Sequence, residues 1–129
     1  MRSVVLDASA LLAMMQSEAG GDKVARLIQD PERTVLVSTL NLSEVFDRLL
    51  RNGIAEETID RLLGHLGMIP VDFTLDQAKV TARLRTVAPA LSLADRACLA
   101  VAHTHEAIAW TTDKIWGRVK ADIDIEILR

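Results

Sequence analysis

Apolar and polar residues follow one another along this chain in blocks that predict strands separated by helices. Short runs of aliphatic residues, typical of buried strands, occur at 3–6, 34–37 and 107–111. Two weaker strands are predicted at 68–71, where Pro70 favours the edge of a sheet, and at 123–127, where Ile alternates with acidic residues. The chain therefore has the strand pattern of a layered α/β protein.

Helical spacing of apolar residues fills the segments between these strands. The predicted helices span residues 8–16, 22–29, 41–51, 56–66, 75–87 and 93–102. Strands that alternate with helices predict a three-layer α/β/α fold with a mainly parallel central sheet. Since no internal repeat, low-complexity segment or linker is visible, we expect residues 1–129 to form a single domain.

The helix predicted at 93–102 differs from the others because it is apolar nearly all round. Such a helix belongs inside a domain. Its only charged residues, Asp95 and Arg96, lie in its first turn, and Ser92 stands three residues before Asp95, the spacing of a capping box. A carboxylate is therefore expected beside the core at this end of the helix.

Composition narrows the environment and the partners of the protein. Half of the residues are hydrophobic but only 3% are aromatic, and the mean hydropathy of +0.20 favours an apolar surface for a partner, including a second copy in a homodimer. No run approaches the roughly 18 apolar residues of a membrane span, and the first strand ends at Asp7 without a signal-peptide pattern. The single Cys98 lies in the apolar helix, so we expect a buried thiol and a cytoplasmic protein without membrane contact.

The net charge of −3 argues against a broad basic surface for nucleic acid, unless several acids bind cations. Four acids are candidates, because Asp7 and Asp113 follow strands whereas Glu44 and Asp95 lie in the first turns of helices. The carboxyl ends of parallel strands meet at one edge of a sheet, so these four side chains are expected to gather there. If these four acids are set aside, the chain has 15 basic and 14 acidic residues, so local basic patches are still possible.

Each acid also has a purely structural interpretation. Asp7 could cap the following helix, Asp113 could open a turn, and the pairs Asn41–Glu44 and Ser92–Asp95 have capping-box spacing. Four carboxylates at one edge would nevertheless repel one another unless a cation neutralised them. Because no His or Cys accompanies them, the oxygen-only set favours Mg²⁺ or Mn²⁺.

Four segments of the chain, VVLDASALLA, LNLSEVFDRLL, LSLADRACLAVA and WTTDKIW, resemble in this order and spacing the four acidic motifs of PIN-domain nucleases. The resemblance covers essentially the whole chain and is closest to the VapC-type toxins of bacterial toxin–antitoxin pairs. It implies that Asp7, Glu44, Asp95 and Asp113 are the catalytic, metal-binding acids, and that Ser9 and Thr111 are supporting hydroxyls in the same site.

The resemblance further implies a metal-dependent endoribonuclease that hydrolyses RNA and is inhibited by a cognate VapB-type antitoxin in a larger toxin–antitoxin assembly. Basic residues near the expected site, Arg96, Lys114 and Arg118, could contact RNA phosphates or simply lie on the surface. Met14 and Met15 suit a surface that receives the antitoxin, or else they fill the core. Trp116 is expected to be a packing residue.

Three alternatives remain open at this stage. The same acids could cut DNA or flap-like substrates, although 129 residues leave no room for a long arch. A PIN-like module could instead bind RNA or protein without cutting. A phosphoacceptor receiver domain fits poorly, because it would need paired acids after the first strand and a late Lys.

Overall fold

The computed structural model describes residues 1–129 and contains five strands and six α-helices. The strands are β1 (Val4–Leu6), β2 (Val35–Ser38), β3 (Ile69–Val71), β4 (Ile108–Thr111) and β5 (Ile125–Ile127). The α-helices are α1 (Ala8–Met15), α2 (Gly21–Gln29), α3 (Thr39–Arg51), α4 (Glu56–His65), α5 (Leu75–Arg83) and α6 (Leu93–His105). Two short 3₁₀ helices, η1 (Leu84–Thr86) and η2 (Lys114–Arg118), complete the elements.

All five strands run parallel in the order β3-β2-β1-β4-β5, which confirms the predicted α/β fold with a parallel central sheet. The central strand β1 pairs on both sides, with Val4 opposite Val35 of β2 and Ile108 of β4. The strand that contains Pro70 lies at one edge, as predicted, and pairs with β2 alone. Neighbouring parallel strands must be joined by crossover connections, which are usually helices. In an all-parallel sheet these helices pack on the sheet and cover both of its faces.

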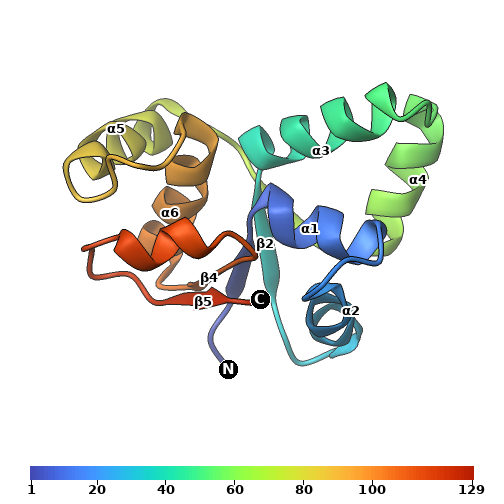
Figure 1. Cartoon of the computed structure of the whole chain (residues 1–129), viewed down its shortest axis with the longest axis horizontal. Helices are drawn as coiled ribbons and strands as arrows, with labels where there is room; N and C mark the ends of the chain where they lie inside the picture. Colours follow the sequence, from blue (N-terminus) through green and yellow to red (C-terminus); the bar gives the residue numbers. More distant parts are fainter.

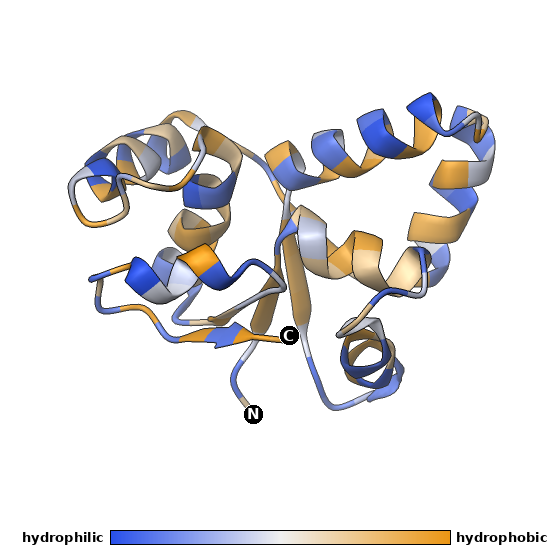
Figure 2. Cartoon of the chain, viewed as in Figure 1, coloured by the Kyte–Doolittle hydropathy of each residue, from blue (hydrophilic) through white to orange (hydrophobic).

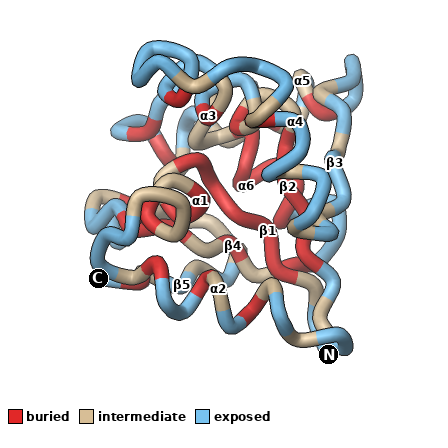
Figure 3. The backbone as a smooth tube through the Cα atoms, turned by 90° about the vertical axis from the view of Figure 1, so that its right-hand side faces the viewer, coloured by how far each residue is buried: buried red, intermediate tan, exposed pale blue.

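Two separate hydrophobic cores lie on the two faces of this sheet. Figure 1 shows α1, α2, α3 and α4 on one side of the strands, and α5 and α6 on the other. Along β1, Val4 and Leu6 belong to the core beneath α1–α4, whereas Val5 belongs to the core beneath α6 and η2. The centre of the fold is accordingly buried along β1 and β2 (Figure 3). Both strands are hydrophobic apart from Ser38 at the end of β2 (Figure 2). This explains why β1 reads as a continuous apolar run rather than an alternating one.

Helix α6 is the buried helix that the sequence predicts. Its residues 97–102 are all buried, Cys98 is completely enclosed, and Trp116 of η2 packs in the same core. The predicted roles of Cys98 and Trp116 as packing residues are confirmed. Helix α5 packs on α6 rather than directly on the sheet (Figure 1).

Three helix boundaries differ from the prediction by two residues or more, and three others differ by one residue. Helix α3 begins at Thr39 instead of residue 41, because Ser38 at the end of β2 caps it by accepting a hydrogen bond from the Leu40 amide at 3.3 Å. Helix α6 extends three residues beyond the predicted end and terminates at Glu106 in the left-handed conformation. The segment predicted as one helix over 75–87 is α5 followed by η1.

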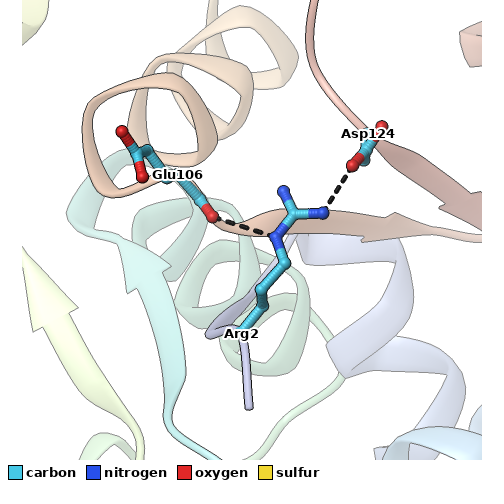
Figure 4. Close-up of polar contacts among 3 residues, drawn as sticks. All are labelled: Arg2, Glu106 and Asp124. Atoms are coloured by element: carbon cyan, nitrogen blue, oxygen red, sulfur yellow. Dashed lines mark hydrogen bonds and ion pairs between the residues drawn. The ribbon is translucent and has the colours of Figure 1, made fainter.

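The amino ends of the strands are fastened by Arg2 (Figure 4). Its guanidinium pairs with the carboxylate of Asp124, just before β5, and its Nε donates to the carbonyl oxygen of Glu106 at 3.2 Å. Arg2 therefore joins the segments that precede β1, β4 and β5. No helix of the protein combines the length and the apolar character that a membrane crossing requires.

Candidate functional site

An open cavity of about 420 Å³ lies at the carboxyl edge of the sheet. Glu44 of α3 and Asp95 of α6 line it together with Asp7 and Asp113, which follow β1 and β4. The structure thus brings the four predicted acids to one cavity. The complete lining is Asp7, Ala8, Ser9, Leu12, Gln16, Glu18, Glu44, Asp47, Arg48, Arg51, Asp95, Thr112, Asp113 and Arg129.

Asp7 is the most deeply buried of the four acids, with only 2% of the residue exposed. It caps α1 by accepting a hydrogen bond from the Ala10 amide at 2.8 Å. The Ser9 hydroxyl donates to the same carboxylate at 2.7 Å, and the Thr111 hydroxyl donates to it at 2.6 Å. These donors fix both carboxylate oxygens, so Asp7 is held rigidly at the floor of the cavity.

Burial raises the pKa of Asp7 from 3.8 to about 6. The hydrogen bonds from Thr111, Ala10 and Ser9 oppose this rise, and the nearby charge of Asp95 adds to it. The ionised form of Asp7 is therefore costly in the folded protein. A bound cation would remove much of that cost.

The two supporting hydroxyls also connect Asp7 to the segment that carries Asp113. The Thr112 amide donates to the Ser9 hydroxyl at 3.0 Å, and the Asp113 amide donates to the Thr111 hydroxyl at 3.1 Å. Asp113 in turn caps η2 by accepting from the Ile115 amide at 3.0 Å. The sequence placed Ser9 and Thr111 in the site by resemblance, and the structure shows which atoms they hold.

Asp95 forms the predicted capping box at the start of α6. Its amide donates to the Ser92 hydroxyl at 3.2 Å, and its carboxylate accepts from the Ser92 amide at 3.4 Å. Burial raises the pKa of Asp95, the hydrogen bonds from Ser92 lower it, and the charge of Asp113 raises it further. The structural and the functional interpretations of Asp95 are therefore compatible.

The capping box predicted for Asn41 and Glu44 is wrong, because both residues lie inside α3, which Ser38 caps. Glu44 instead accepts a hydrogen bond from the side-chain amide of Asn41 at 3.1 Å. Burial raises the pKa of Glu44, the hydrogen bond from Asn41 lowers it, and the charge of Asp95 raises it.

None of the four carboxylates has a basic partner. The three ion pairs of the protein join Arg2 to Asp124, Arg26 to Asp22 and Arg51 to Asp47. Even Cys98, buried behind the site, has a raised pKa because of burial and the charges of Asp7, Asp95 and Glu44. The four acids therefore bring negative charge to the cavity without a direct basic partner, an electrostatic setting that favours a cation.

The donor set fits Mg²⁺ or Mn²⁺ in chemistry, since every candidate ligand is a carboxylate oxygen and the lining contains no His or Cys. In their present positions, however, no three such side chains are placed to hold one ion. Each carboxylate satisfies a local cap or side-chain donor instead. Binding would consequently require rotation of some of these side chains.

Basic residues at the cavity differ from those that the sequence suggested. Arg96 is directed towards α5, where it donates to the Thr81 carbonyl at 3.0 Å, and neither Lys114 nor Arg118 lines the cavity. The lining contains Arg48, Arg51 and Arg129 instead. RNA contact by the three suggested residues stays a prediction that this geometry does not favour.

Helical spacing could have identified two of the basic residues that line the cavity. Arg48 and Arg51 follow Glu44 by four and seven residues, so they share its face of α3. Arg51 pairs with Asp47 at 2.9 Å, as helical spacing predicts, whereas Arg48 has no ion-pair partner. No local signal points to Arg129, whose place depends on the β4–β5 pairing and on its hydrogen bond to the Ala19 carbonyl.

Solved structures of known proteins share this fold over nearly the whole chain. VapBC2 from Rickettsia felis, solved bound to a promoter DNA fragment, matches with a TM-score of 0.74 at 16% identity, covering 98% of this chain and 99% of that one. A toxin–antitoxin complex from Klebsiella pneumoniae matches with a TM-score of 0.75 at 16% identity over 98% of both chains. VapC20 from Mycobacterium tuberculosis, described as a sarcin–ricin loop cleaving toxin, matches with a TM-score of 0.67 at 18% identity over 86% and 90% of the two chains.

A comparison with curated proteins finds no match. The sequence model of the PIN domain family, by contrast, matches residues 4–122, which include all four acids at the cavity. This match confirms the family that the four motifs suggested. The protein belongs to the PIN domain family.

Proposed function

We propose that this protein is a Mg²⁺- or Mn²⁺-dependent endoribonuclease that acts as the toxin of a toxin–antitoxin pair. The observation that carries the proposal is the cavity in which Asp7, Glu44, Asp95 and Asp113 meet without a basic partner. Membership of the PIN family and structural similarity to proteins described as toxins support it.

In this proposal Asp7, Asp95 and Asp113 hold the ion, and Glu44 completes the site or helps to hold a second ion. When bound, such an ion lowers the pKa of its water and neutralises charge on the scissile phosphate. Asp7 offers a carboxylate oriented by Ser9 and Thr111, whereas Asp95 and Asp113 each use one carboxylate oxygen in a cap hydrogen bond and keep the other for the ion. Ser9 and Thr111 thereby act as positioning residues.

The substrate strand would contact the arginines of the cavity. Arg48, Arg51 and Arg129 are the basic residues of its lining, and guanidinium groups bind phosphate oxygens well. Arg48 is the strongest candidate, because Arg51 is engaged with Asp47 and Arg129 with a backbone carbonyl. These contacts would position RNA without reading its sequence.

A non-catalytic PIN-like module that binds RNA or protein is the second candidate. It is favoured by one observation, the absence of any three side chains placed to hold an ion. Such a module would bind its partner equally well with Asp7 replaced by Asn. The two candidates therefore differ in whether an intact carboxylate set is needed.

The decisive experiment is RNA cleavage by the purified protein with Mg²⁺ or Mn²⁺, with and without EDTA. We expect cutting only with free metal, with 5′-phosphate and 3′-hydroxyl ends on the products. A protein in which Asp7, Asp95 and Asp113 are all replaced by Asn serves as the contamination control. Cutting that continues in excess EDTA, or equally in this control, would exclude the proposal.

An apolar groove of about 200 Å³ provides a place for the antitoxin. Its six lining residues, all hydrophobic, are Met14, Met15, Leu49, Ile54, Leu62 and Leu66. Methionines suit a surface that receives the side chains of another chain, and a groove between helices suits an amphipathic helix. An Arg of the same antitoxin segment could enter the acidic cavity on the other side of α1, where it would pair with the carboxylates.

Replacement of Met14 or Met15 by Glu tests this groove. Each change should weaken binding of a cognate VapB-type antitoxin while RNA cleavage persists. Leu50→Glu is the matched control, because Leu50 is 45% exposed on α3 but lies outside the groove. Unchanged binding in both folded methionine variants would place the antitoxin elsewhere.

The proposed assembly also includes a homodimer, which light scattering at micromolar concentration would test. Helix α4 can contribute less apolar surface than its pattern suggested, since Ile59 is fully buried, whereas Leu62 remains 45% exposed. A purely monomeric protein would contradict the dimer without affecting the nuclease proposal.

A further inference from the structure

Asn41 is a fully buried polar residue beside the acidic cavity. It lies in the first turn of α3, on the side that packs against α6, and has an exposed fraction of 0%. A buried amide is unfavourable in a core unless its hydrogen bonds are made. Its partners therefore show what the residue does.

Both donated hydrogen bonds of the Asn41 side chain go to the two helices that carry acids. The Nδ2 group donates to Glu44 Oε1 at 3.1 Å and to the carbonyl oxygen of Ala94 at 3.1 Å. Ala94 directly precedes Asp95 in the first turn of α6. One side-chain amide thus joins the Glu44 carboxylate to the backbone beside Asp95.

The side-chain carbonyl oxygen of Asn41 makes no hydrogen bond that would stabilise the fold. Its Oδ1 is buried and has no hydrogen-bond partner. A residue kept only to stabilise the α3–α6 contact would be better served by an apolar side chain of the same size, which leaves no acceptor unsatisfied. The two hydrogen bonds that the Asn41 amide donates therefore explain why an Asn occupies this position, and one of them goes to the Glu44 carboxylate.

We propose that Asn41 is a positioning residue that sets the place of the Glu44 carboxylate relative to Asp95, ready for a divalent cation. The inference rests on the proposed metal-dependent function and extends it to a residue of the second motif that is not one of the four acids. The donated hydrogen bond favours ionised Glu44 and limits its rotamers, while the bond to Ala94 keeps α3 in register with the start of α6.

The test is Asn41→Leu, which keeps the number and branching of the side-chain heavy atoms and removes both donors. We expect Mn²⁺ binding, measured by calorimetry on the protein alone, to weaken by about tenfold, the lower end for loss of an outer hydrogen bond in a metal site. RNA cleavage should return towards the wild-type rate at saturating Mn²⁺, because the metal concentration for half-maximal rate rises and kcat changes little.

The matched control is Thr81→Val. Thr81 is also fully buried against α6 with an unpartnered hydroxyl, but it lies on α5 away from the cavity. Its replacement should leave Mn²⁺ binding unchanged. Should Asn41→Leu fail to fold, Asn41→Ser carries the same test, because its hydroxyl is too short to reach both partners.

A double-mutant cycle with Glu44→Gln separates positioning from general damage. If Asn41 acts through Glu44, adding Asn41→Leu to Glu44→Gln should not weaken Mn²⁺ binding further. An equal loss in both backgrounds would overturn the inference, as would wild-type Mn²⁺ affinity in folded Asn41→Leu. A wild-type protein that bound no Mn²⁺ would refute the proposed function itself, a result distinct from either of these.

Discussion

The two ends of the parallel sheet handle charge in opposite ways. At the amino end, Arg2 pairs with Asp124, and both side chains remain largely exposed, at 48% and 69%. At the carboxyl end, Asp7 is buried, and no basic residue pairs with it or with Asp95. Paired, exposed charge is compatible with a purely structural role, whereas unpaired, buried charge destabilises a fold and points to a function that needs it.

Replacement of one carboxylate at each end of the sheet should test this difference most clearly, and the largest effect is expected at the carboxyl end. Asp95→Asn should lower RNA cleavage in Mn²⁺ by more than about 100-fold, because loss of a direct ligand exceeds the effect of an outer hydrogen bond. The capping box should weaken only slightly, since an amide oxygen still accepts from Ser92.

Asp124→Asn is the control at the amino end and should leave cleavage unchanged. Cleavage rates at several Mn²⁺ concentrations measure both effects. Similar losses in the two variants would mean that the carboxyl end is not the active site.

The fold was predictable because its signals are local. The β1 run, the amphipathic pattern of α3 and the apolar α6 each specify their element without reference to distant residues. Parallel strands then require the chain segments after β1 and β4 to meet at one edge of the sheet, so the sequence alone predicts that Asp7 and Asp113 lie near each other.

What the sequence could not predict depends on contacts between distant segments. Arg129 reaches the cavity only because β5 pairs with β4. Arg96 is directed away from the cavity because its guanidinium donates a hydrogen bond to the Thr81 carbonyl of α5. Helix α3 begins before its apolar spacing predicts, because the Ser38 hydroxyl at the end of β2 caps it. The contact between Asn41 and Ala94 spans 53 positions and has no local signature.

The second prediction concerns the stability cost of the buried charge at the carboxyl end, measured in EDTA. Burial raises the pKa of Asp7 in the folded protein to about 6, above its ordinary value of 3.8. The Asp7 carboxyl group binds its proton more tightly in the folded protein than in the unfolded chain. Its stabilising contribution to the free energy of unfolding is therefore fully present below about pH 4 and is lost as the pH rises through about 6. The difference in pKa corresponds to about 3 kcal/mol of unfolding free energy above that range.

Asp7→Asn should remove this pH dependence. The variant should be more stable than wild type at pH 8, by less than the full amount because the amide accepts fewer hydrogen bonds, and the advantage should vanish or reverse near pH 4. Urea unfolding at both pH values provides the measurement. A variant that is less stable by the same amount at both would show that Asp7 is only a helix cap.

The third prediction contrasts a free arginine at the cavity with the paired arginine at the opposite end. Arg48→Ala should weaken the binding of RNA to the Asp95→Asn protein. It should also reduce the slope of log K against log salt concentration by about 1, the value for loss of one phosphate contact. Arg2→Ala, made in the same background, should change neither quantity. Fluorescence anisotropy from about 50 to 200 mM salt would measure both quantities. Equal effects of the two substitutions would mean that RNA does not contact Arg48.

The smallest effect is expected for the ion pair at the amino end, and it completes the comparison. Arg2 and Asp124 are both solvent-exposed, so salt and water screen their attraction. A double-mutant cycle of Arg2→Ala and Asp124→Ala, followed by urea unfolding, should give a coupling energy below about 1 kcal/mol, and less at high salt. Arg2→Ala alone should cost more than Asp124→Ala, because it also removes the donor to the Glu106 carbonyl that joins the segments before β1 and β4. A coupling energy above about 2 kcal/mol that resists salt would contradict this expectation. The charges at the two ends would then change the free energy of unfolding by similar amounts, with the ion pair at the amino end raising it and the unpaired Asp7 lowering it.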